Sequence, residues 1–217
     1  MKKLVVVNGG PRKNWNTNTL LKAAAEGARS VGAAVRCYDL YDLDYTGCKS
    51  CYACKRATNA PVICVVQDGL RQLLEDIHSA DALLVGSPVY FLEVTGMTRC
   101  FLERLLYPLI TYDRVDNPET FTRFPRRLKT EWLFTMGVEE GIARASGNYA
   151  KFDNYQALFK RLLGDCEYFT ATDTCHIDDY SQYAASKFDP IHKKARKREL
   201  STVEAQEAFV IGAGLVS

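Results

Sequence analysis

The residues of this chain that are best suited to chemistry lie in a loop between a predicted strand and a predicted helix. The run Leu4–Val7 is apolar and rich in valine, as strands are, and a helical pattern follows over Leu20–Ala28. Between them, residues 8–17 read NGGPRKNWNT and contain no carboxylate. A helix N-terminus presents unpaired N–H groups and a partial positive charge, so this loop predicts a phosphate-binding site.

The loop has the donors that a phosphate needs. Gly9 and Gly10 allow close approach of the backbone, Arg12 can donate two parallel hydrogen bonds, and Asn16 and Thr17 can donate from their side chains. Neither the dinucleotide pattern G-x-G-x-x-G nor the triphosphate pattern ending in Gly-Lys-Ser/Thr is present. We therefore expect a mononucleotide, and the alternative is an ordinary Gly-Gly-Pro turn.

Predicted strands alternate with predicted helices along the rest of the chain. The apolar and helical patterns place strands at 33–40, 81–86, 131–137 and 166–172, and helices at 69–78, 96–106, 149–163 and 190–211. This alternation predicts an α/β fold with a parallel sheet. Five strands with a phosphate loop after the first match the flavodoxin-like doubly wound three-layer sandwich, with strand order 2-1-3-4-5. We expect a single domain over 1–217, with 107–130 as an insertion or long loop.

Ligands of such folds bind at the carboxyl ends of the strands, where the predicted loops 8–17, 86–96 and 135–147 would meet. The second loop offers an apolar and aromatic surface, and the third follows the fourth strand. The residues concerned are Pro88, Val89, Tyr90, Phe91, Thr135, Met136 and Gly137. A phosphate site beside an aromatic surface is what flavin mononucleotide (FMN) needs. The alternative for the second loop is a strand end that supplies core aromatics.

Composition excludes several other classes of function. The chain has 217 residues, a net charge of +2 and 25% charged residues, so no global field favours nucleic acid or membrane. The basic run over 192–198 lacks interleaved aromatics and is interpreted as a solvated helix face. No secretory signal or membrane span is evident, and we expect a cytoplasmic protein. None of the three histidines is placed for hydrolase chemistry, so no side chain is predicted to be catalytic.

Four of the eight cysteines form a separate motif. Two residues separate Cys48 from Cys51 and Cys51 from Cys54, and nine residues separate Cys54 from Cys64. Thiolates at this spacing can hold an iron-sulfur cluster, with Cys64 as the fourth ligand. Four thiolates can also bind zinc, and two of them can form a redox disulfide. We favour a set of thiols with no metal over the cluster, because such motifs also occur without a metal.

Three segments resemble a known family. NGGPRKNWNT resembles the NGSPRKNGNT loop of the NADPH-dependent FMN reductase-like branch of the flavodoxin superfamily, with Gly10 in place of a serine and Trp15 in place of a glycine. ADALLVGSPVYFLEVTGMTRCFLER resembles that branch's GSPVYF segment. GCKSCYACK, with Cys64, resembles the cysteine segment of iron-sulfur flavoproteins and their cluster-free relatives. The three matches cover about residues 3–104.

The resemblance implies specific roles for these residues. Gly10, Pro11, Arg12, Asn16 and Thr17 would enclose the FMN phosphate, and the second and third loops would line the isoalloxazine ring. The implied activity is an FMN-dependent NAD(P)H oxidoreductase that passes electrons to a quinone, flavin, nitro compound or protein acceptor. It also implies a homodimer or homotetramer, with 107–130 as the expected contact.

Two other functions fit the sequence. One is an iron-sulfur flavoprotein that acts as an electron-transfer module, with a cluster on Cys48, Cys51, Cys54 and Cys64. The other is a protein of the same fold that has lost its flavin and serves as a binding or structural protein, because fold alone does not fix function.

Overall fold

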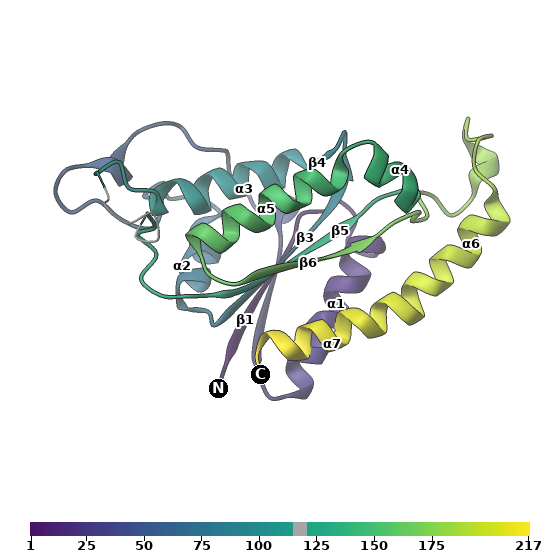
Figure 1. Cartoon of the computed structure of the whole chain (residues 1–217), viewed down its shortest axis with the longest axis horizontal. Coiled ribbons are helices and arrows are strands. Elements are labelled where there is room, and N and C mark those ends of the chain that lie inside the picture. The colour runs from purple at the N-terminus through teal and green to yellow at the C-terminus, as the bar shows by residue number, and fades with distance from the viewer. Residues whose placement is uncertain (115–120) are drawn as a thin grey trace.

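A parallel sheet forms the centre of the molecule in the computed structural model, which describes residues 1–114 and 121–217. Its strands are β1 (Lys3–Asn8), β2 (Ala34–Asp39), β3 (Ala82–Tyr90), β5 (Lys129–Thr135) and β6 (Cys166–Ala171). They lie in the order β2-β1-β3-β5-β6, and each neighbouring pair is parallel (Figure 1). Counted along the chain without the short β4, this is the predicted order 2-1-3-4-5, so the flavodoxin-like fold is confirmed.

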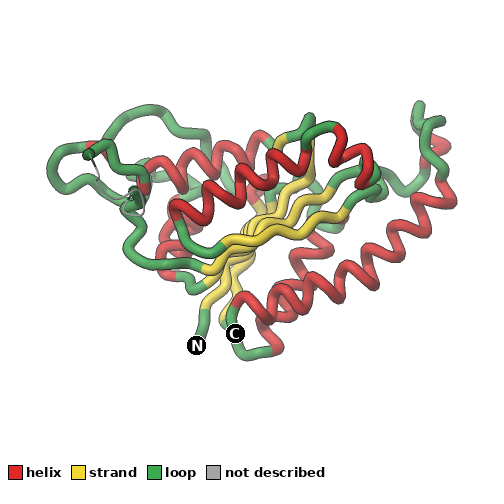
Figure 2. The backbone as a smooth tube through the Cα atoms, viewed as in Figure 1, coloured by secondary structure: helices red, strands yellow, loops and turns green. Residues whose placement is uncertain are grey.

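Helices cover both faces of the sheet, as the red and yellow elements of Figure 2 show. One face carries α2 (Arg71–Ser79), α3 (Gly96–Leu106) and α5 (Asn148–Leu162), and the other carries α1 (Asn16–Ser30) and α7 (Ala205–Leu215). Side chains of a strand alternate between these faces. On β5, Trp132 and Phe134 belong to the first core and Leu133 to the second. Successive apolar side chains of one strand thus fill the cores on both faces of the sheet, which gives the three layers.

Shorter elements complete the described chain. They are the helix α4 (Glu140–Ala145), the helix α6 (Pro190–Glu199), the π-helical segment Leu200–Glu204, and 3-10 turns at Leu40–Asp42, Ala53–Lys55, Tyr107–Leu109 and Tyr180–Gln182. The predicted helix over 190–211 is therefore interrupted by the π-helical segment. Helix α4 was not predicted, and it lies within the segment 135–147 that was expected to be a loop.

A sixth strand, β4 (Glu93–Val94), was not predicted. It pairs antiparallel with the end of β3 through a two-residue turn formed by Phe91 and Leu92. Both turn residues have a positive φ, 51° and 68°. Such turns normally carry Asn-Gly or Asp-Gly, which adopt positive φ without strain. The bulky Phe-Leu pair gives no sequence signal for a turn, so this hairpin could not be predicted locally.

Part of the predicted insertion at 107–130 is described. An isolated antiparallel bridge joins Ile110 to Thr122, and the Arg123 guanidinium donates to the carbonyl oxygens of Cys54 and Ala60. These bonds join the segment to the loop over residues 48–64, which carries the four cysteines of the motif and is called the cysteine-bearing loop below. The remainder of the insertion, 115–120, lies outside the described residues.

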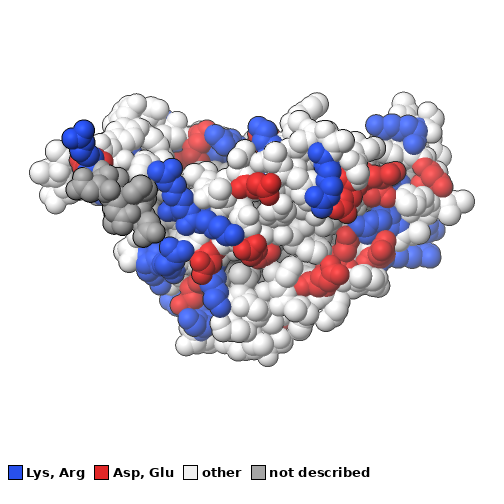
Figure 3. All heavy atoms as spheres, in the orientation of Figure 1, with Lys and Arg blue, Asp and Glu red and all other residues white. Residues whose placement is uncertain are grey.

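Charges of both signs are mixed on the face of the molecule seen in Figure 3. Within the basic run of α6, Lys193 pairs with Asp173, Arg196 with Glu204, and Lys197 with Asp178. These acidic partners reduce the positive charge that the run offers to an anionic polymer. The prediction of a solvated face is correct only in part, because His192, Lys194 and Arg198 are exposed whereas Lys193 is buried and Arg196 largely so.

Glu131 on β5 gives a testable pH dependence of stability. Burial raises its pKa to about 7, and the carboxylate of Glu167, its partner on β6, adds to the shift. The unfolded chain has a carboxyl pKa of about 4.3, so the folded chain binds more protons between these values and loses stability as the pH rises. We expect Glu131→Gln to raise the free energy of unfolding at pH 8 by on the order of 2 kcal/mol.

Urea unfolding at pH 8 and pH 4 tests this expectation. At pH 4 the carboxyl group of Glu131 is protonated in the folded chain, so the substitution should change stability little. An equal gain at both pH values would show that the charge of Glu131 is not its cause.

Candidate functional site

A cavity of about 150 Å³ lies at the carboxyl ends of the strands. It is lined by eleven of the twelve residues predicted to contact a flavin: Gly10, Pro11, Arg12, Asn16, Thr17, Pro88, Val89, Tyr90, Thr135, Met136 and Gly137. These residues come from the three predicted loops, which the parallel topology brings to the same edge of the sheet. The structure therefore brings all the predicted residues except Phe91 to one cavity.

Phe91 is the predicted residue that does not line this cavity. Its side chain is fully exposed, since it occupies the positive-φ turn between β3 and β4. Tyr90, one position earlier, lies at the wall of the cavity and is 47% exposed. Of the two aromatic residues expected to line the site, Tyr90 does so and Phe91 does not, and Pro88 and Val89 lie beside Tyr90 in the cavity wall.

One end of the cavity is suited to an anion. Helix α1 begins at Asn16, four residues earlier than the apolar pattern predicted, and no side chain caps its N-terminus. No acidic residue lies in its first turn. Asn16 and Thr17 are buried there, and the Thr17 hydroxyl lies 2.7 Å from that of Thr135. The unpaired N–H groups of this turn can donate to a phosphate, so the residues present fit the phosphate of FMN.

Asn8 holds the preceding turn in shape. Its Oδ1 accepts a hydrogen bond from the Gly10 N–H at 3.0 Å, and its Nδ2 donates to Asp39 Oδ1 at 2.7 Å. A side chain at Gly10 would place a Cβ 3.3 Å from Pro88 Cδ and 3.2 Å from Asn8 Oδ1. A side chain here would require its neighbours to shift by a few tenths of an ångström, and glycine lets the turn lie against the β3 loop without that shift.

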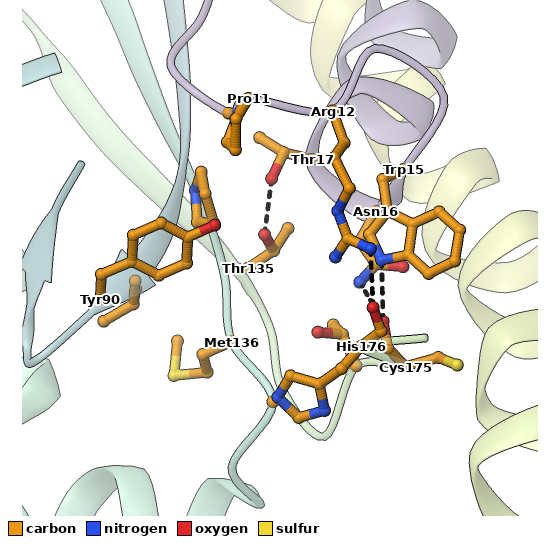
Figure 4. A pocket seen from close by; sticks show the side chains of 15 residues that line it. Pro11, Arg12, Trp15, Asn16, Thr17, Tyr90, Thr135, Met136, Cys175 and His176 are labelled. Atoms are coloured by element: carbon orange, nitrogen blue, oxygen red, sulfur yellow. Dashed lines mark hydrogen bonds between the residues drawn. The ribbon is translucent and has the colours of Figure 1, made fainter. Parts of the chain in front are cut away.

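A fourth segment, which the sequence analysis did not include, closes the cavity. Thr174, Cys175 and His176 follow β6 and line the cavity opposite Tyr90 (Figure 4). The Cys175 carbonyl oxygen accepts hydrogen bonds from Trp15 Nε1 at 3.0 Å and Asn16 Nδ2 at 2.8 Å. The segment also follows a strand at the carboxyl edge, and that position was the signal that could have identified it.

Trp15 is part of this closure. Two cations contact its ring, with Arg12 Cζ 4.1 Å and Lys197 Nζ 4.3 Å from the ring centroid. Stacked cations on an indole are favourable, and they link the phosphate loop to α6. The tryptophan that departs from the family loop thus fastens the loop to the C-terminal part of the chain.

The four cysteines of the second motif line a different, smaller cavity of about 20 Å³. Cys54 is buried and Cys51 is exposed, and burial raises the pKa of the Cys54 thiol. The buried Arg104 reaches this cavity and donates from Nε to Cys64 Sγ at 2.9 Å. Within 1–114 and 121–217, no three Cys, His, Asp or Glu side chains are arranged to hold a metal ion.

No helix among the described residues combines the length and apolar character needed to cross a membrane.

The sequence matches one protein family over more than half of its length, and it also matches several curated relatives. Residues 2–121 match the family model described as NADPH-dependent FMN reductase. An iron-sulfur flavoprotein of Archaeoglobus fulgidus is 34% identical over 102 residues, which cover 47% of this chain and 48% of that protein. A second iron-sulfur flavoprotein of that organism is 27% identical and matches 70% of this chain and 73% of its own. The chain thus spans about half the length of the first curated relatives it matches.

Two solved structures share the fold across nearly the whole chain. An NAD(P)H:quinone oxidoreductase from Methanothermobacter marburgensis has 17% identity and a TM-score of 0.64, and it covers 93% of this chain and 98% of its own. An FMN-dependent NADH-azoreductase from Bacillus anthracis, in complex with FMN, has 12% identity and a TM-score of 0.65 with both chains fully covered. At these identities the likeness concerns the fold alone.

Proposed function

This chain belongs to the NADPH-dependent FMN reductase family, and we propose that it is an FMN-dependent oxidoreductase that takes electrons from NADH or NADPH. The observation that carries the proposal is the cavity at the strand ends, where an uncapped helix N-terminus lies at one end and Tyr90 forms a wall. These two features match the two ends of FMN, which has an anionic phosphate and a flat aromatic ring.

Different residues of the cavity would bind the phosphate and the ring of FMN. The first turn of α1 and Arg12 would hold the phosphate through charge-assisted hydrogen bonds. Tyr90 would flank the ring, and Met136 and Gly137, which follow β5, would border its other side. When bound, FMN supplies the hydride and electron transfer, and the protein supplies position and electrostatics. No side chain is assigned as a general acid or base.

We further propose that the electron acceptor is a small oxidant, namely a quinone, a nitro compound or free flavin, or else a partner protein. Tyr90 is 47% exposed, so the aromatic wall is accessible from outside the cavity. A nicotinamide and an acceptor could therefore approach the flavin in turn from that side.

The first experiment is anaerobic purification followed by a visible spectrum, with flavin, iron and zinc quantified in the same sample. We expect about one FMN per chain, and oxidation of NADH or NADPH when a benzoquinone or a nitrobenzene is added. A colourless protein that also fails to take up added FMN would contradict the proposal. FMN binding without any nicotinamide oxidation would leave a flavoprotein that is not an NAD(P)H oxidoreductase.

The second candidate function is an iron-sulfur flavoprotein that transfers electrons without a nicotinamide substrate. The observation that favours it is the convergence of Cys48, Cys51, Cys54 and Cys64 on one cavity. Their thiols are suitable ligands, but a cavity of about 20 Å³ has room for a single water, so a cluster would require the loop over 48–64 to open. Iron at about four atoms per chain would support this candidate, and its absence after anaerobic purification would count against it.

We also propose that the protein forms a homodimer or homotetramer, as the family resemblance implies. The expected contact is the segment 107–130, of which residues 107–114 and 121–130 are described. Within it, Tyr112 is 65% exposed, and its hydroxyl lies 2.6 Å from that of Tyr107. Light scattering on the holoprotein tests this proposal, and a monomer at every concentration would contradict it.

A further inference from the structure

Lys193 is a buried cation within the basic run of α6. It is 3% exposed, whereas the neighbouring Lys194 lies in solvent. An ammonium group loses its hydration when it is buried, which is costly unless an opposite charge and hydrogen-bond acceptors replace the water. The partners of Lys193 therefore show where the fold holds this positive charge.

These partners lie at one wall of the proposed FMN site. Lys193 Nζ donates to the carbonyl oxygens of Gly137 at 3.3 Å and Asp173 at 3.0 Å, and it forms an ion pair with the Asp173 carboxylate. Gly137 lines the cavity, whereas Lys193 does not. The ammonium group is thus separated from the cavity by the Gly137 peptide, in keeping with the position of α6 beside the ends of β5 and β6 (Figure 1).

The hydrogen bond to Gly137 completes the pairing of this wall. The carbonyl oxygens of the residues before and after Gly137 accept from backbone N–H groups of the segment that follows β6, at 2.9 and 2.7 Å. The carbonyl oxygen of Gly137 itself accepts from the side chain of Lys193. Glycine is conformationally free, so this bond restrains a peptide of the wall that could otherwise turn. Lys193 therefore helps to fix the side of the cavity that would border the flavin ring.

The charge of Lys193 has the Asp173 carboxylate as its counter-ion. The ring of His192 also bonds this carboxylate through Nε2, but that ring is 55% exposed. The next cation of α6, Arg196, forms its own ion pair with Glu204. Substitution of either Lys193 or Asp173 by a neutral residue therefore leaves the charge of the other largely uncompensated behind the cavity wall.

We propose that Lys193 is a positioning residue for the wall at Gly137 and that its charge favours binding of reduced FMN over oxidised FMN. The inference rests on the proposed function, because FMN is the ligand. Reduction of FMN by two electrons and one proton adds one negative charge to its ring system. A positive charge close to the ring stabilises that form more than the neutral oxidised form, and a cation behind Gly137 is close enough to do so.

The test is the midpoint potential of bound FMN, measured by anaerobic reduction of the holoprotein together with a reference dye. Lys193→Met keeps the length and apolar volume of the side chain and removes the charge. At an effective dielectric constant of about 20, two charges about 10 Å apart change an equilibrium by about tenfold. We therefore expect the preference for reduced FMN to fall about tenfold, which lowers the potential of this two-electron couple by about 30 mV.

Asp173→Asn should shift the potential in the opposite direction. Asp173 has a φ of 55°, which asparagine also tolerates, so the substitution keeps the backbone and removes the negative charge. The charge of Lys193 is then uncompensated, and the potential should rise. A purely structural role predicts no such opposition, because a loosened wall would affect FMN in the same direction in both variants. Thermal unfolding verifies that each variant is folded, and Lys193→Gln replaces Lys193→Met if the methionine variant is not.

Lys194→Met is the matched control. Lys194 is the next residue of α6 and loses the same charge on the same substitution, but its side chain is exposed and solvent screens it. Its potential should equal that of the wild type. Unchanged potentials in the Lys193 and Asp173 variants, or shifts of the same sign, would overturn the inference. A wild-type protein that binds no FMN would instead refute the proposed function, which keeps the two failures distinct.

Discussion

Replacing Asn16 with aspartate is expected to weaken FMN binding by at least about a hundredfold, because two like charges within about 4 Å repel by several kcal/mol at a partly buried site. Asn16 is the first residue of α1, is 92% buried, and lines the anion-binding end of the cavity. The substitution keeps the shape of the side chain and adds one negative charge where the phosphate would lie. It also removes the hydrogen bond from Asn16 Nδ2 to the Cys175 carbonyl oxygen, and the loss of that bond would affect both ligands alike. Riboflavin has no phosphate, so its dissociation constant should change far less than that of FMN.

Asn14→Asp is the control for this experiment. Asn14 belongs to the same loop, but its side chain is exposed and accepts a hydrogen bond from Lys22. The same chemical change at this position should alter FMN affinity little, because solvent screens the charge and Lys22 lies beside it. Equal losses for the two variants, or a parallel loss of riboflavin binding by Asn16→Asp, would contradict the assignment of the phosphate site.

Replacing Asp68 with alanine is expected to lower the free energy of unfolding of the apoprotein by about 3–5 kcal/mol, the cost of leaving a buried charge without its partner. Arg104 on α3 is 99% buried and donates two hydrogen bonds to the Asp68 carboxylate, at 2.8 and 3.1 Å. It also donates to the carbonyl oxygens of Thr46 and Val66. This one side chain therefore anchors both ends of the cysteine-bearing loop to α3.

The ionisation of Asp68 agrees with this role. Burial alone would raise the pKa of its carboxyl. The hydrogen bonds from Arg104 and from the Leu70 N–H, together with the nearby positive charges, outweigh burial and hold the pKa below its usual range. The stability that the pair contributes is present above the pKa of an unfolded aspartate and is lost as the pH falls through the lower folded value. The difference between wild type and Asp68→Ala should therefore shrink under strongly acidic conditions.

Asp165→Ala is the matched control for Asp68→Ala. Asp165 also pairs with an arginine, Arg127, at 3.1 Å, but both side chains are largely exposed. Exposed pairs contribute little to stability, so urea unfolding should detect essentially no change. If Asp68→Ala were as harmless as Asp165→Ala, Arg104 would not depend on Asp68 for its burial.

Most of the strands could be predicted because their signal is local. The four apolar residues Leu4–Val7 and the short apolar run before Gly86 identify buried parallel strands without any knowledge of their neighbours. Chain order and the handedness of crossovers then fix which loops share an edge. The hairpin at Phe91 and Leu92 was not predicted, because bulky residues rarely adopt positive φ. The pairing of β3 with β4 must offset the conformational strain of these two residues.

The candidate site was predictable only in part, for a related reason. By itself, the sequence determined the fold class, the strand order and the two loops that the family resemblance marks, because each depends on residues close together in the chain. Only the tertiary structure decided that Thr174–His176 closes the cavity and that Phe91 lies outside it. The bond from Arg12 to His176 joins positions 164 residues apart, and no local pattern encodes a contact at that separation. Such contacts exist only once the sheet has brought its carboxyl-end loops together.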